Sequence, residues 1–209
     1  MTEGWIETQI AESVRRGNCP ICDAVEASRE SYLTWIRTNL NDGKFRQAVS
    51  SSGGYCLSHL HQVMDSLGTN PYNRLNLLKV MRSVMLMLGD GQPVVGCNLC
   101  TSLRDTAKAY AVVINSSRIQ GSKGRPLALC EIHAPLFNQR PGQHDDHSTA
   151  THASAARRPT PSSKAATDFI NTTEAVLKNF HLKDPEVLGR EIERCEALMI
   201  KAMLTSEKQ

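Results

Sequence analysis

The chain has 209 residues, a formal net charge of +3, and 40% hydrophobic but only 5% aromatic residues. This length allows one larger domain or two small ones with a tail, and so few aromatic residues favour a helical core over a β-sandwich. Lys and Arg are dispersed, and apolar stretches such as 84–88 are short. Neither a nucleic-acid partner nor a membrane-spanning segment is therefore expected.

Apolar residues recur at helical spacing through the first third of the chain. Glycines offer stops at Gly17 and Gly68, and 41–43 reads Asn-Asp-Gly, which breaks a helix. Four helices are predicted, over 3–16, 23–40, 44–51 and 57–67.

The next part of the chain repeats this pattern. Asn70 and Pro71 form an N-cap followed by proline at the first helical position, and the helix should run to Leu88. Another helix should follow 97–100, with an apolar face that carries Leu103, Ala107, Tyr110 and Ile114.

Residues 138–167 are rich in Pro, Gly, Ser, Thr and His and are predicted to form a disordered linker. We interpret its histidines as solvated rather than as a further metal site, because loose histidines lack groups that fix a ligand. These histidines are His144, His147 and His152.

Helical periodicity returns at 168–209. Asp184, Pro185 and Glu186 are typical of a helix start, and the helix that follows is amphipathic and carries methionine. Such a helix can fold back on the rest of the chain as a hairpin or dock on another protein. The sequence leaves both alternatives open.

Cysteine and histidine pairs form two matching sets. Cys19-Pro20-Ile21-Cys22 is followed by Cys56-Leu57-Ser58-His59, and Cys97-Asn98-Leu99-Cys100 is followed by Cys130-Glu131-Ile132-His133. Three thiols and one imidazole make a closed ligand set for tetrahedral Zn²⁺, so two zinc ions per chain are predicted. In order along the chain, Cys19, Cys22, Cys56 and His59 would bind one ion, and Cys97, Cys100, Cys130 and His133 the other. The rival arrangement pairs Cys19 and Cys22 with Cys130 and His133.

This order predicts an all-α protein built from a duplicated helical zinc-binding module of about 70 residues. The first Cys₃His repeat would cover 1–70 and the second 71–137. The linker 138–167 and the C-terminal helical hairpin or docking helix, 168–209, complete the predicted organisation.

Other uses of the cysteines fit the pattern less well. An iron–sulfur cluster is the alternative metal centre, although ligation by four cysteines is commoner. Disulfides or a redox pair are disfavoured because no signal peptide is visible, the pattern lacks a βαβ setting, and disulfides do not explain the recurring histidines. A reducing, cytoplasmic location is expected.

Two stretches resemble a family of bacterial proteins with a CPxC motif, a GxCxxHL motif and no assigned activity. They are Gly17-Asn18-Cys19-Pro20-Ile21-Cys22 and Gly53-Gly54-Tyr55-Cys56-Leu57-Ser58-His59-Leu60. The resemblance covers roughly 10–135 and leaves the tail unmatched. The second Cys/His set lacks the proline and the leading glycine pair.

No catalytic pattern accompanies the cysteines. Both sets offer four ligands, whereas a catalytic zinc keeps one position open, and no P-loop, nucleophile-elbow or dinucleotide fingerprint is found. We therefore expect a non-catalytic, zinc-stabilised helical module that binds another protein, as an accessory or adaptor subunit of a larger assembly. The alternative is a metal- or redox-responsive regulator that touches nucleic acid through Arg15, Arg16, Lys123 and Arg125.

Overall fold

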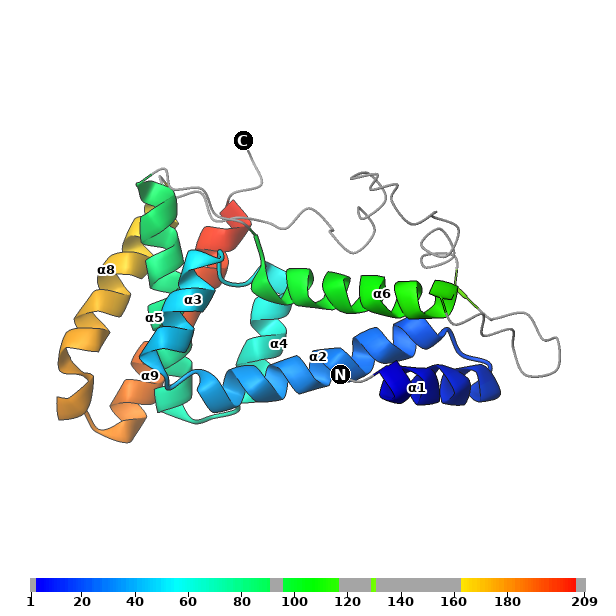
Figure 1. Cartoon of the computed structure of the whole chain (residues 1–209). Helices are drawn as coiled ribbons and strands as arrows, with labels where there is room; N and C mark the ends of the chain where they lie inside the picture. Colours follow the sequence, from blue (N-terminus) through cyan, green and yellow to red (C-terminus); the bar gives the residue numbers. More distant parts are fainter. Residues whose placement is uncertain (1–2, 91–95, 117–128, 131–162, 206–209) are drawn as a thin grey trace. The chain divides into compact units, whose positions relative to one another are not determined.

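The computed structural model describes residues 3–90, 96–116, 129–130 and 163–205 (Figure 1). Within these ranges all regular elements are helices, which confirms the predicted all-α class. None of these helices is both long and apolar enough to cross a bilayer. The α-helices are α1 (Glu3–Arg16), α2 (Pro20–Asn39), α3 (Gly43–Ser51), α4 (Leu57–Leu67), α5 (Pro71–Gly89), α6 (Asn98–Ser116), α8 (Lys164–Asn179) and α9 (Pro185–Leu204), and a 3₁₀ turn, η1 (Phe180–Leu182), joins the last two.

Four of the helices, α3, α5, α8 and α9, begin where a capping side chain accepts hydrogen bonds from the free N–H groups of the first turn. The side chain of Asn70 accepts hydrogen bonds from the backbone N–H groups of Tyr72 and Asn73, at 3.0 and 3.4 Å. Asp184 accepts one from Glu186 at 2.8 Å. In both helices proline occupies the next position, where its missing N–H costs nothing. These local signals explain why the helix starts could be predicted from sequence.

The described residues form two compact units, the first of which contains 3–32, 100–116 and 129–130. Side chains from α1, α2 and α6 make its core, and Ile10, Ile21 and Tyr110 are almost fully buried. Cys19, just before α2, and Leu129, next to Cys130, pack against the same cluster. The core therefore brings two sequence-distant cysteines into one neighbourhood.

The second unit contains the described residues 33–90, 96–99 and 163–205 and is organised around α5. Helices α3, α4, α8 and α9 all contact α5 (Figure 1). The buried side chains of α5 are Leu75, Leu77, Leu78, Val80, Met81, Val84 and Met85. An apolar surface of this extent is the main stabilising contribution to a helical unit of this kind.

The C-terminal helices fold back within this second unit. Helices α8 and α9 pack on each other and on α5, and Phe169, Ile192 and Met199 have no exposed surface. Arg74 on α5 binds both carboxylate oxygens of Glu196 on α9, with an Nε–Oε1 distance of 2.7 Å. Of the two alternatives for the tail, the structure shows the hairpin that packs on its own chain.

The predicted linker and repeats differ from this arrangement in two ways. Helix α8 begins at Lys164, inside the predicted linker 138–167, because Ser163 caps it by accepting a hydrogen bond from Ala166. Both compact units also combine segments from either side of residue 70, so neither coincides with a predicted repeat. The linker histidines His144, His147 and His152 lie outside the described residues.

Candidate metal centre

The first ligand pair lies at the start of α4. Cys56 is the N-cap residue of this helix and His59 follows in its first turn. Residues three positions apart at a helix start lie on the same side, so both side chains can face one point. The preceding Gly53 and Gly54 have φ values of 106° and 67°, which suit glycine and allow the chain to turn sharply into the helix.

The second pair has the same local design at the start of α6. Cys97 directly precedes this helix and Cys100 lies in its first turn. Cys97 is buried, whereas Cys100 is partly exposed. Cysteine binds metal as the thiolate, and this pair, like the first, lies at a helix start with a spacing of three.

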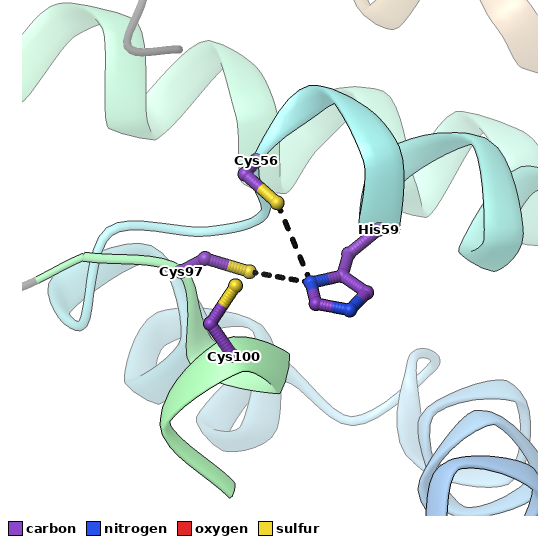
Figure 2. Close-up of side chains that lie close together, drawn as sticks. All are labelled: Cys56, His59, Cys97 and Cys100. Carbon is purple, nitrogen blue, oxygen red and sulfur yellow. Dashed lines mark hydrogen bonds between the residues drawn. The ribbon is translucent and has the colours of Figure 1, made fainter. Parts of the chain in front are cut away.

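These two pairs meet and form the cluster Cys56, His59, Cys97 and Cys100, which we call the Cys₃His centre (Figure 2). Its four ligand atoms all lie within 4.8 Å of one another. Nδ1 of the imidazole lies 3.4 Å from Sγ of Cys56 and 3.3 Å from Sγ of Cys97. Tetrahedral zinc, with its usual bond lengths, separates sulfur from nitrogen by about 3.6 Å. The arrangement therefore fits one tetrahedral ion.

The thiols around His59 change its acidity. Burial alone would lower the pKa of the imidazole, but hydrogen bonds to the sulfurs of Cys56 and Cys97 outweigh it and raise the pKa to about 9. Burial, together with the nearby Cys97 sulfur, raises the pKa of Tyr55 as well. A cation at the centre would favour the neutral imidazole and the deprotonated thiols, because these are the forms that bind metal.

A second cluster consists of Cys19, Cys22 and Cys130, which we call the three-cysteine cluster. Sγ of Cys22 lies 3.5 Å from Sγ of Cys130, and Cys22 is exposed. Desolvation, and then hydrogen bonds and repulsion involving the other two sulfurs, raise the pKa of Cys22 to about 12. The predicted fourth ligand, His133, lies outside the described residues.

The pairing of the ligands along the chain was predicted wrongly. The sequence order assigned Cys56 and His59 to Cys19 and Cys22, but the structure places them with Cys97 and Cys100. Likewise, Cys130 lies with Cys19 and Cys22, as in the rival arrangement. The physical reason is the packing of the helices, because the core of the first unit holds the start of α2 close to Leu129.

Sequence reasoning also overlooked residues that join the two ligand pairs without being ligands. Asn98, between Cys97 and Cys100, donates hydrogen bonds to the loop before Cys56. The sequence feature that could have pointed to Asn98 is its position inside the second CxxC motif. Cys195 belongs to neither cluster and is buried in the second unit.

Comparison with protein-family models, with curated proteins and with solved structures found no match. The chemistry of the two clusters is therefore inferred from the residues of this chain alone. Both could hold a metal ion through soft sulfur ligands, with one imidazole at the Cys₃His centre.

Proposed function

We propose that this protein is a non-catalytic helical module stabilised by two zinc ions, which serves as an accessory or adaptor subunit. The observation that best supports this proposal is that the ligand atoms of four side chains lie within 4.8 Å of one another, those of Cys56, His59, Cys97 and Cys100. We also propose that the chain is related to the bacterial CPxC…GxCxxHL proteins. A reducing cytoplasmic location is part of the same proposal, because it keeps the thiols available for metal.

Zinc is favoured over an iron–sulfur cluster by the size of the Cys₃His centre. Ligand atoms within 4.8 Å of one another surround space for a single ion. An iron–sulfur cluster places several iron and sulfide atoms between its cysteines, so its ligands must stand further apart. Three cysteines and one histidine are also a common structural zinc set.

A structural role is favoured over a catalytic one by the number of ligands. Catalytic zinc uses three protein ligands and keeps the fourth position for water or substrate. At the Cys₃His centre four side chains already converge. A zinc ion there would cross-link α4 to α6 and stabilise the fold, with no position left for a reacting molecule.

The protein-interaction role is supported by apolar side chains on the folded C-terminal hairpin. Leu182 in η1 is 76% exposed, and Val187 at the start of α9 is 38% exposed. Because the buried face of α9 is used inside the second unit, a protein partner would meet this outer surface. Leu182→Asp should abolish partner binding without changing stability, whereas loss of stability would contradict this assignment.

Metal analysis of the purified protein tests the proposal. We expect a colourless protein with two zinc ions per chain, and Co²⁺ substitution should give the absorption bands of tetrahedral thiolate coordination. Cys56→Ser should lose one ion. Cys195→Ser is the matched control, since this cysteine lies outside both clusters, and should retain two. A brown protein that contains iron would refute the zinc assignment.

A second candidate, a redox-responsive regulator, is favoured by the geometry of the three-cysteine cluster. Cys22 is exposed and its sulfur lies 3.5 Å from that of Cys130. Hydrogen peroxide could oxidise these two thiols. Their S–H bonds would break, an S–S bond would form, and the two protons and two electrons would go to the peroxide, whose O–O bond would break to give two water molecules. A metal ion held by these sulfurs would then be released. Release of one zinc ion by stoichiometric hydrogen peroxide, reversed by a thiol reductant, would support this role. Unchanged zinc content would exclude it.

A further inference from the structure

The two ligand pairs of the Cys₃His centre are joined by hydrogen bonds that involve no metal. The backbone N–H of Asn98 donates to the carbonyl oxygen of Gly54 at 2.9 Å. Its side-chain Nδ2 donates to Oγ of Ser52 at 2.8 Å. Asn98 lies next to Cys97, and Gly54 lies two residues before Cys56. One residue therefore ties the start of α6 to the loop that carries the other pair.

The loop that accepts these bonds is itself fixed. Oγ of Ser52 donates to the carbonyl oxygen of Val49 at 2.9 Å, and the backbone N–H of Gly54 donates to the same oxygen at 2.9 Å. A Cβ atom built on Gly54 would lie 2.9 Å from Cγ2 of Val84 and 3.2 Å from Sδ of Met81. The loop is thus closely packed on α5, and Asn98 is anchored to a rigid support.

The other CxxC motif cannot make the same connection. The position of Asn98 is taken there by Pro20, between Cys19 and Cys22. Proline has neither a backbone N–H nor a polar side chain, so both donors are missing. Hydrogen bonds can therefore hold the motif with Asn98 in place without metal, whereas the motif with Pro20 cannot form the same bonds.

We propose that Asn98 is a positioning residue that preforms the Cys₃His centre before metal binds. This inference rests on the proposed function, because it assigns a role at the same centre. Its physical basis is preorganisation: ligands already held in place do not lose conformational freedom when the ion arrives, so the ion binds more tightly. Groups that orient metal ligands typically contribute about 10- to 100-fold in metal affinity.

Zinc affinity, measured by competition with a chromophoric chelator, tests this role in the full-length protein. The zinc step that Cys56→Ser abolishes is assigned to the Cys₃His centre. Asn98→Ala should weaken that step by about 10-fold and leave the other unchanged. Ser52→Ala removes one acceptor and should act in the same direction. Asn76→Ala is the matched control, because Asn76 donates a similar 2.7 Å bond to Asn41 on the surface of the second unit.

Hydrogen exchange supplies a readout that a purely stabilising role would not change. In metal-free wild-type protein the Asn98 amide should exchange slowly, because its N–H is already bonded to Gly54. Rapid exchange of that amide, or unchanged zinc affinity in both Asn98→Ala and Ser52→Ala, would overturn the inference. If Asn98→Ala fails to fold, Ser52→Ala decides. Failure of the wild-type protein to bind zinc would instead refute the proposed function.

Discussion

Gly54→Ala provides a stringent test of how the loop before Cys56 is held. Gly54 has a φ of +67°, and a Cβ atom there would approach Val84 to 2.9 Å and Met81 to 3.2 Å. A left-handed backbone conformation costs a residue with Cβ about 1–2 kcal/mol. Forcing an extra carbon into a closely packed core costs about 1–3 kcal/mol. The two contributions together predict a loss of about 3 kcal/mol in the free energy of unfolding.

Gly17→Ala separates these two contributions. Gly17 also has a left-handed φ, +78°, but a Cβ atom added to it would meet open space, with no contact within 4 Å. It should therefore lose only the backbone contribution, about 1 kcal/mol. In a protein of this size, each kcal/mol lowers the melting temperature by about 2–4 °C.

Thermal unfolding of both variants, each saturated with zinc, gives the comparison. Gly54→Ala should melt about 10 °C below wild type, and Gly17→Ala about 3 °C below. Gly54→Ala should also bind zinc more weakly at the Cys₃His centre, because its carbonyl group accepts the Asn98 bond. Equal melting temperatures for the two variants would refute the argument that Gly54 is closely packed on α5.

Three further predictions concern the second unit. Arg74→Ala should cost about 3 kcal/mol in urea denaturation because it leaves the buried Glu196 unpaired, whereas Arg82→Ala, which breaks a more exposed pair, should cost less than about 1 kcal/mol. Equal losses would contradict this difference in burial. Ile192→Asp and Met199→Asp should unfold the second unit, seen as loss of helical circular dichroism, because both side chains are fully buried; retained stability would mean that α9 does not fold back. Hydrogen bonds from Lys178 and then Arg82 lower the pKa of Glu174, so its ionised carboxylate should stabilise the folded state at neutral pH, and this stabilisation should disappear as the pH falls through that pKa. Glu174→Gln should therefore lower the free energy of unfolding at pH 7 and match wild type in acid. A difference between the two proteins that does not change with pH would refute this linkage.

Local features of the chain were predictable because their causes are local. Asn70 and Asp184 cap the helices that follow them, through bonds to backbone groups two or three residues away. The candidate ligands 56/59 and 97/100 were recognisable for the same reason, since each of these two pairs lies at a helix start with a spacing of three. The all-α class follows from these helices together.

The pairing of the ligands could not be predicted, because it depends on contacts between distant segments. Cys22 and Cys130 are separated by 108 positions in the sequence, against 34 positions between Cys22 and the predicted partner Cys56. The entropic cost of the longer loop is greater by only about 1 kcal/mol. Burial of Ile21, Tyr110 and their neighbours in the first unit's core outweighs this difference easily. Nothing in the sequence of either motif indicates which distant side chains will be buried together.

The fold-back of the tail was undecided for a related reason. An amphipathic helix has the same sequence pattern whether it packs on its own chain or on a partner. The bond between Arg74 and Glu196 and the burial of Met199 identify α5 as the surface that α9 covers. None of these three residues is distinguished in the sequence from other charged or apolar positions of its helix.

The zinc content of the double variant Cys56→Ser/Cys97→Ser tests the central claim most directly. Both cysteines belong to the Cys₃His centre, so the account predicts that each single variant and the double variant all retain one zinc ion per chain. Pairing in sequence order would instead place one cysteine at each site, and the double variant would then lose both ions. A double variant that contains no zinc, beside single variants that each contain one, would contradict the account.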